Sequence, residues 1–292
     1  MRKFFYVILI IVFFVGCNSN KVFVKENKIV ERDKKLLTSH YLSLQNNKVS
    51  MCPGYQKKQK YFIPKKLYNY PEISTVYIYG YSGNIDINKH LYQILSELSS
   101  FSLSGSFPFL NNLTITNCDI EYIPKSISYI RNLERLNLTN NRIKDIAWEI
   151  SYLDKLTYIN LAKNNLGRLT DKEINNLLLK LSTVKNLKTL FLTDNFFEEI
   201  PENIKYLTNL EFLYIGYNYL KCFPCIVTEL PNLKSLTIDY SEELLSFPEC
   251  IDNFPKGVIV NLLVRPPYIE DYKRENIELL KARYPNVRWS AP

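Results

Sequence analysis

The sequence predicts a solenoid of the α/β class: a right-handed β-α superhelix with a concave parallel β-sheet and short helices on its convex side. Self-similarity at a fixed period of 20 to 50 residues is typical of repeat folds, in which each unit stacks on its neighbours. The intervals between successive repeat starts are 23, 23, 31, 23 and 23 residues. The starts themselves are Leu110, Leu133, Leu156, Leu187, Leu210 and Leu233. A repeated surface, rather than a catalytic pocket, is therefore where we expect function.

Each repeat fills the pattern L-x-x-L-x-L-x-x-N-x-L, as in LERLNLTNNRI from Leu133 and LEFLYIGYNYL from Leu210. Side chains alternate along a strand, so the fourth and sixth residues point to one side and form the core. The ninth residue, usually Asn, is expected to bond backbone groups that the bend leaves unpaired. The pattern resembles the leucine-rich repeat from about residue 70 to residue 264. The 23-residue form is similar to the subclass with short convex helices.

The second half of most repeats predicts a short convex helix, as in IPENIKYL. Proline suits the first helical turn, and Ile204 and Leu207 face back into the core. The 31-residue interval predicts a longer helix, because Thr170 and Glu173 form a capping-box pattern. Apolar residues follow at helical spacing: Ile174, Leu177, Leu178 and Leu181.

The repeat region is predicted over residues 73–264, with about seven to eight repeats, since the pattern also recurs once from Ile73. Residues 36–72 match the pattern poorly and are predicted to form an N-terminal cap. Residues 265–292 contain Pro266 and Pro267 and then a helical pattern. They are predicted to form a C-terminal helical cap, because terminal repeats need a polar outer face.

Residues 1–16 are predicted to be a signal peptide. Arg2 and Lys3 precede an apolar run from Phe4 to Val15, which is shorter than the ~20 residues that a membrane-spanning helix needs. The following residue, Cys17, ends the stretch FVGC.

FVGC is similar to a bacterial lipobox, in which cleavage precedes a cysteine that then carries diacylglycerol. Only Gly16 and Cys17 fit the usual lipobox, so a simple cleaved signal with a chance cysteine stays open as an alternative. Residues 17–35 hold many charges and few apolar residues, which predicts a lipidated, flexible tether. We therefore expect an exported protein that is lipid-anchored to the bacterial membrane, at the cell surface or in the periplasm.

The charge balance gives little indication of a partner. Lys and Arg number 37 against 29 acidic residues, a net charge of +8, and removal of Arg2 and Lys3 with the signal lowers it to +6. Such an excess is modest, and export separates the protein from nucleic acid. No nucleic-acid partner is expected.

The cysteines offer one motif that looks catalytic, CFPC at Cys222 to Cys225. A C-x-x-C pair can exchange thiols when one thiolate has a lowered pKa, but Phe223 and Pro224 fill an ordinary slot of the repeat. A disulfide between Cys225 and Cys250 is favoured, because neighbouring repeats bring these positions within reach. With no histidine nearby in the sequence, no metal site is predicted, and no cofactor.

Aromatic residues recur at strand positions that face away from the core. Positions three, five and seven are expected to point outward, with position eight at the rim. Contiguous outward aromatics are typical of an interaction surface. The alternative is that Tyr, with 22 residues, is simply common and favours strands. The candidate binding patch comprises Tyr158, Phe191, Phe212, Tyr214, Tyr217 and Tyr240, flanked by Lys163, Asp194 and Asp239.

The resemblance implies a non-catalytic, monomeric binding module of the bacterial leucine-rich-repeat lipoprotein kind, which serves adhesion or interaction with a host or envelope. The concave face would grip a protein, or a glycan as the alternative ligand, and the lipid would hold the membrane. Two other functions stay open: an envelope thiol oxidoreductase that uses CFPC, and a structural scaffold in the periplasm.

Overall fold

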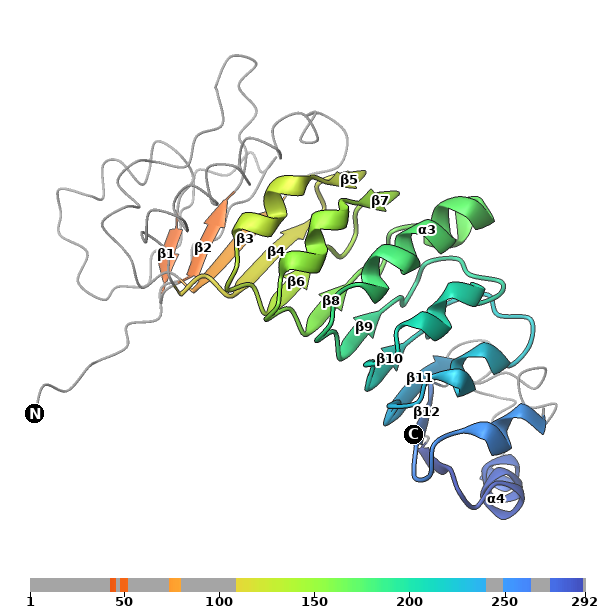
Figure 1. The fold of residues 1–292 in the computed structure, drawn as a ribbon. Helices are drawn as coiled ribbons and strands as arrows, with labels where there is room; N and C mark the ends of the chain where they lie inside the picture. The colour runs from red at the N-terminus through yellow and green to blue at the C-terminus, as the bar shows by residue number, and fades with distance from the viewer. Residues whose placement is uncertain are drawn as a thin grey trace, which may run out of the picture.

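The computed structural model describes residues 43–45, 48–51, 74–79, 109–239, 249–263 and 274–290. The predicted signal peptide, Cys17 and the tether lie outside these residues. One sheet holds 11 of the described strands, in the order β1-β2-β3-β4-β6-β8-β9-β10-β11-β12-β13. Figure 1 shows these strands side by side in one row, with the helices stacked along one side of it. The predicted solenoid with a parallel sheet is confirmed.

The strands of this sheet are β1 (Ser43–Gln45), β2 (Lys48–Met51), β3 (Thr75–Tyr79), β4 (Asn112–Thr116), β6 (Arg135–Asn137), β8 (Tyr158–Asn160), β9 (Thr189–Phe191), β10 (Phe212–Tyr214), β11 (Ser235–Asp239), β12 (Ile259–Leu263) and β13 (Arg288–Ser290). A separate pair is formed by β5 (Tyr122–Ile123) and β7 (Asp145–Ile146). All neighbouring strands are parallel except β1 and β2.

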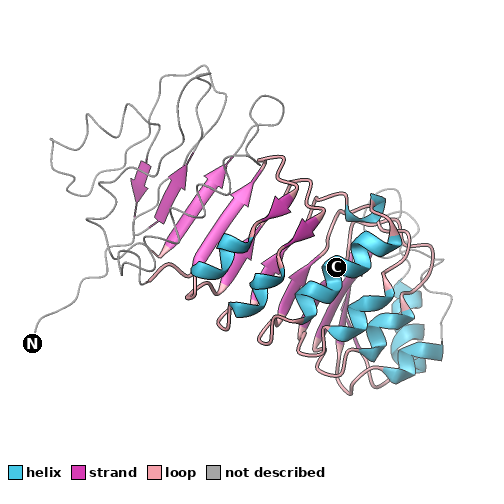
Figure 2. Ribbon diagram, turned by 45° about the horizontal axis from the view of Figure 1, so that its top comes forward, coloured by secondary structure: helices cyan, strands magenta, loops and turns pink. Residues whose placement is uncertain are grey.

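The helices on the convex side of the sheet are mainly short 3₁₀ helices (Figure 2). These are η3 (Lys125–Tyr129), η4 (Trp148–Tyr152), η5 (Leu166–Arg168), η6 (Glu202–Tyr206), η7 (Cys225–Glu229) and η8 (Glu249–Asn253). Two α-helices, α3 (Asp171–Ser182) and α4 (Arg274–Arg283), are longer. None of the helices in the described part of the chain is long and apolar enough to cross a membrane.

The core forms between the sheet and the helices, as the repeat pattern predicts. The fourth and sixth residues of successive repeats are almost without solvent exposure, for example Leu136 and Leu138 at 0%. Val76 and Ile78 are equally buried on β3, so the repeat that begins at Ile73 shares this core. Each repeat thus buries its leucines only because the next repeat covers them.

The predicted asparagine ladder is present at Asn141, Asn164, Asn195 and Asn218, which are all buried. Asn195 illustrates the bonding: its Oδ1 accepts from the backbone N–H of Asn164 at 2.8 Å, and its Nδ2 donates to the Leu161 carbonyl at 2.8 Å. The amide therefore satisfies backbone groups in the bend of the preceding repeat, which would otherwise be unpaired in the core.

The longer convex helix in the 31-residue interval is confirmed as α3. Thr170 caps it, accepting from the Glu173 backbone N–H while the Glu173 side chain bonds the Thr170 N–H. The four apolar residues predicted to face the core are buried. Lys180 is buried too, and its Nζ contacts both carboxylate oxygens of Asp145 at 2.6 and 2.7 Å. This ion pair ties α3 to β7 of the repeat before it.

Both ends of the sheet gain strands that the repeat pattern does not contain. At the start, β1 and β2 pair antiparallel, and β2 lies parallel to β3. At the end, α4 packs with Leu280 and Tyr284 buried, and β13 then adds a strand to β12. The domain boundaries drawn from the sequence stay predictions, while the closing helix is present and the strand after it was not foreseen.

Candidate functional site

The concave face is built from the third and fifth residues of each repeat, which strand register aligns into two columns. One column pairs Arg135 with Tyr158, and the other pairs Asn160, Phe191 and Tyr214 in turn. Parallel strands lie about 4.8 Å apart, so large side chains in one column must meet across strands.

Three aromatic rings and one guanidinium form a continuous line across β6, β8, β9 and β10, which we call the aromatic row: Arg135, Tyr158, Phe191 and Tyr214. The Arg135 Cζ lies 3.7 Å from the centroid of the Tyr158 ring. The Tyr158 and Phe191 ring centroids are 5.3 Å apart. Phe191 and Tyr214 are stacked, with centroids 3.9 Å apart and planes 3° from parallel. Core packing does not require these contacts, because all four side chains stand on the face opposite to the buried leucines.

The row has polar surroundings on both sides along the sheet. Asn112, Thr114 and Asn137 precede it on β4 and β6, and Ser235 and Asn261 follow on β11 and β12. Phe212, the third residue of β10, is half-buried beside the row. An apolar centre with a polar edge is the usual anatomy of a protein-binding surface.

Position seven does not face outward as predicted. In the repeats from β6 to β10 the strands are only three residues long and end at position five, after which the chain turns. Thr116, Ala162 and Asp239, all at position seven, are buried. The expectation that position seven faces outward thus fails at these residues. Ala162 lies beyond the end of β8, whereas Thr116 and Asp239 are the last residues of β4 and β11 and are buried all the same.

Asp239, predicted to flank the binding patch, instead holds the turn of the preceding repeat. It is 6% exposed, and its carboxylate oxygens accept from the backbone N–H groups of Tyr217 at 2.9 Å and Asn218 at 3.2 Å. In earlier repeats, the equivalent backbone N–H groups, those of Asn164 and Asn195, donate to the asparagine of the next repeat. Asp239 takes the place of that asparagine for the N–H of Asn218. Asp239 therefore has a structural role here.

Tyr217, Lys163 and Asp194 occupy the eighth repeat position, at the rim of the sheet. Each has a positive φ, near +57°, so each sits in a left-handed turn. Tyr217 is 47% exposed. Lys163 and Asp194 form an ion pair with Nζ and Oδ2 3.7 Å apart. Tyr240, the remaining predicted patch residue, lies outside the described residues.

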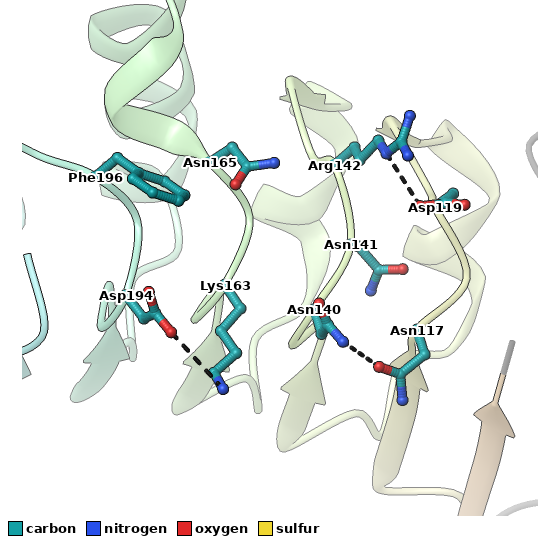
Figure 3. A pocket seen from close by; sticks show the side chains of 9 residues that line it. All are labelled: Asn117, Asp119, Asn140, Asn141, Arg142, Lys163, Asn165, Asp194 and Phe196. Carbon is teal, nitrogen blue, oxygen red and sulfur yellow. Dashed lines mark hydrogen bonds and ion pairs between the residues drawn. The ribbon is translucent and has the colours of Figure 1, made fainter. Parts of the chain in front are cut away.

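A depression of about 390 Å³ opens at this rim, where the chain leaves β4, β6, β8 and β9. Figure 3 shows the side chains that line it. They come from four successive turns: Asn117 and Asp119; Asn140, Asn141 and Arg142; Lys163 and Asn165; Asp194 and Phe196.

The CFPC motif is not a thiol pair in the structure. Cys225 forms a disulfide with Cys250, and their Cα atoms are 5.6 Å apart. This is the pairing that the spacing of the repeats favoured. Cys222 is an exposed cysteine outside any disulfide, and Cys118 is a buried thiol in the asparagine position of its repeat that donates to the Thr116 carbonyl. Among the described residues, no three potential His, Cys, Asp or Glu ligands come together for a metal.

Charge pairs line the edge of the concave face where the strands begin. Glu211, directly before β10, contacts Lys234 at 2.6 Å and Lys188 at 3.0 Å. Hydrogen bonds from Lys234 and then Lys188 hold the pKa of the Glu211 carboxyl below its ordinary value. This edge is thus a small network of alternating charge beside Phe212.

Sequence reasoning missed three sets of residues. Arg135 stands in the same outward column as Tyr158, but it was not recognised from the sequence as a cation that could stack on an aromatic ring. Of the rim residues that line the depression, only Lys163 and Asp194 were predicted, as flanks of the patch. Except for Asn141 at position nine, the lining residues recur at positions eight and ten of the repeats, so the same periodic alignment could have found the others. Exposed convex tyrosines at one repeat position, Tyr129, Tyr152 and Tyr206, were also missed.

Comparison with known proteins supports the repeat and the fold. Residues 108–166 match the leucine rich repeat family. The search of curated proteins gave no match. A leucine-rich repeat protein of Leptospira interrogans is similar in structure, with a TM-score of 0.35 and 17% identity, over 78% of this chain and 69% of the other.

An internalin of Listeria monocytogenes is similar at a TM-score of 0.39 and 18% identity, over 74% of this chain and 68% of the internalin. The repeat pattern, the parallel sheet with its asparagine ladder and the family match over residues 108–166 together show a leucine-rich repeat fold.

Proposed function

We propose that this protein is a non-catalytic binding module whose concave face grips a protein partner. The observation that carries the proposal is the aromatic row. Tyr and Arg are enriched among the residues that dominate binding energy at protein interfaces, and they cluster at the centre of such interfaces. Here one Arg and three rings lie in contact across four neighbouring strands, each on the face that the core does not use.

The row is also preorganised for binding. Stacking of Phe191 on Tyr214, and of Arg135 on Tyr158, fixes side chains that would otherwise lose freedom when a partner docks. Ordering each rotamer-rich side chain on binding costs about 0.5–1.5 kcal/mol, so prior order favours affinity. The polar side chains on both sides of the row can supply the hydrogen bonds of an interface rim.

The second part of the proposal concerns the place of action. We propose that residues 1–16 direct export and that Cys17 carries the lipid, so that the module belongs with bacterial leucine-rich-repeat lipoproteins of the 23-residue subclass. Adhesion, or interaction with a host or envelope protein, would follow from such a location. Support comes from the basic start, the short apolar run and the glycine–cysteine pair in the sequence.

A matched pair of double variants tests the concave face. Phe191→Ser with Tyr214→Ser removes the stacked rings, whereas Tyr152→Ser with Tyr206→Ser removes two exposed tyrosines from the convex helices. Each variant is used as bait beside the unchanged protein, and the captured proteins are quantified by mass spectrometry.

A partner of the concave face is captured by the unchanged protein and the convex variant but not by the concave variant. The affinity for that partner should fall about 100-fold with the concave change, as expected when two central residues are truncated. Equal capture by all three baits would remove the concave-face proposal, and loss with the convex variant alone would move the site to the other face.

The anchor is tested separately with Cys17→Ser. Cells given a radiolabelled fatty acid should label the unchanged protein and not the variant, and the variant should leave the membrane fraction. Protease treatment of intact cells then distinguishes surface exposure from the periplasm. Labelling that persists without Cys17 would contradict the lipid-anchor proposal while leaving the binding proposal intact.

A further inference from the structure

The rim depression is a second concave feature, separate from the aromatic row. It lies where four successive strands end, and its volume of about 390 Å³ falls at the small end of the range for small-molecule sites, about 300–1,000 Å³. Lys163 and Asp194 were predicted to flank the aromatic patch, but they line this depression instead. Its size fits a short ligand rather than a protein segment.

The backbone that shapes the depression is held in a conformation that side chains seldom adopt. Seven of its nine lining residues have a positive φ, and the two exceptions are Asn141 and Arg142. Asn and Asp tolerate this region, but bulky residues do so rarely, and Phe196 has a φ of +65°. Strained positions of this kind concentrate at binding sites.

Neighbouring residues hold Phe196 in place. A Cβ on Gly167 would lie 2.4 Å from the Phe196 carbonyl oxygen, so the two backbones pack as closely as glycine permits. The Arg168 guanidinium covers the Phe196 ring at 4.1 Å. The ring therefore forms a fixed apolar wall at one end of an otherwise polar depression (Figure 3).

The charges around the depression cancel. Arg142 Nε pairs with Asp119 at 3.0 Å, and Lys163 pairs with Asp194 at 3.7 Å, which leaves two positive and two negative lining side chains. Between these pairs, the Asn140 amide donates to the Asn117 side-chain oxygen. Net neutrality disfavours a ligand of either charge, because such a ligand would lose hydration without a matching countercharge.

Three backbone amides of the turns already donate to carbonyl groups of the next repeat. The N–H of Asn117 donates to the Asn140 carbonyl at 2.9 Å, that of Asn140 to Ala162 at 2.9 Å and that of Lys163 to Thr193 at 3.0 Å. Hence these three N–H groups are not available to an anion such as phosphate, and we consider recognition by the side chains of the depression.

We infer that the rim depression binds a neutral saccharide unit. Carboxylate, amide and guanidinium groups each present two polar atoms in one plane, which suits the neighbouring hydroxyl groups of a sugar. Both donors and acceptors are present, as hydroxyls require, and the Phe196 ring offers an apolar wall to the C–H surface of a sugar ring. The site does not depend on the concave row, so the two can succeed or fail independently.

The test uses ligand-observed NMR on the full chain in a detergent without sugar groups. The probes are four neutral disaccharides, lactose, maltose, cellobiose and diacetylchitobiose, with glucuronic acid and glucosamine as charged probes. Asp194→Asn removes one carboxylate, and Asn occupies the same left-handed position at Asn117 and Asn140. Arg142→Ser removes one guanidinium. Asp154→Asn, at an exposed turn outside the depression, is the matched control.

At least one neutral disaccharide should bind with a Kd near the millimolar range, and both site variants should weaken it about tenfold. Asp154→Asn and the concave double variant should bind as the unchanged protein does. The inference is overturned if no neutral probe binds, if a charged probe binds more tightly, or if Asp194→Asn and Arg142→Ser bind normally. Loss of saccharide binding in the concave double variant would also overturn it, by placing the sugar on the aromatic row.

Discussion

Aromatic side chains reach solvent on both faces of the solenoid, but they are arranged differently. On the concave face, strand register brings Tyr158, Phe191 and Tyr214 into contact. On the convex face, Tyr152 and Tyr206 recur at the ends of their helices, and no ring contact joins them in the described part of the chain. Exposure of an aromatic residue therefore does not mark a site by itself, and our proposal for the concave face rests on the contacts between rings of neighbouring repeats.

The two faces also differ in what holds them together. The convex side carries the disulfide between η7 and η8 and the partly buried Lys180–Asp145 ion pair, both of which join neighbouring repeats. The concave row rests on a sheet whose stability comes from the leucine core and the asparagine ladder. Stability and binding should accordingly respond to different residues.

The largest expected effect on stability comes from the disulfide. Cys225→Ser with Cys250→Ser opens a loop closed over a sequence separation of 25 residues, which should lower the free energy of unfolding by about 3 kcal/mol. Urea unfolding followed by circular dichroism measures this change. Binding of the concave partner should remain unchanged below the unfolding transition.

Cys222→Ser is the control for this prediction, since Cys222 is free and exposed three residues away. It should leave both stability and binding as they were. A large loss of stability from Cys222→Ser would mean that this thiol contributes to the disulfide cross-link. Loss of partner binding in the double variant would break the separation between the two faces.

An intermediate effect is expected from Asn195, which lies between the two faces. Asn195→Ala leaves the backbone N–H groups of Asn164 and Leu166 without their side-chain acceptor in the core. Buried groups left unpaired cost about 1–3 kcal/mol, so unfolding should become easier by about 2–3 kcal/mol. Asn176→Ala, on the exposed side of α3, is the matched control and should change stability little, as urea unfolding can show. Equal effects would contradict the ladder's structural role.

The fold could be predicted because its determinants are periodic. The leucines and the asparagine at position nine recur at fixed positions of the repeats, and the Thr170–Glu173 capping box has a fixed spacing at one helix end. The spacing of these residues therefore indicates what they do. The Cys225–Cys250 pair followed in the same way, since stacking fixes which residues of adjacent repeats meet.

The candidate site was harder to predict, because its geometry depends on where strands end. Asp239 looks like an outward residue by alternation, but the chain brings its carboxylate back to the N–H groups of Tyr217 and Asn218. Phe196 follows the bend after β9, and its position depends on a left-handed φ and on the close approach to Gly167. Neither property appears in the apolar pattern. The repeat period thus specifies which residues align in columns, while turn geometry decides which of these residues face outward.

The smallest expected effect concerns the concave edge, where Glu211 is held by Lys234 and Lys188. Hydrogen bonds from these lysines lower the pKa of Glu211 in the folded protein below its ordinary value of 4.5. Their stabilisation is therefore complete above the ordinary pKa and is lost as the pH falls through the folded pKa. Because both lysines are largely exposed, the contribution should be only about 0.5 kcal/mol near neutral pH.

Glu211→Gln provides the measurement, since it keeps the shape and removes the titrating group. Urea unfolding of both proteins should show a small deficit for the variant above the ordinary Glu pKa and convergence of the two at acidic pH, where the unchanged carboxyl is protonated too. Added salt should shrink the deficit, because exposed charges are screened. If Glu211→Gln lowered the free energy of unfolding as much as loss of the disulfide does, the concave edge beside Phe212 would contribute substantially to the stability of the solenoid. The proposed separation between residues for stability and residues for binding would then fail at this edge.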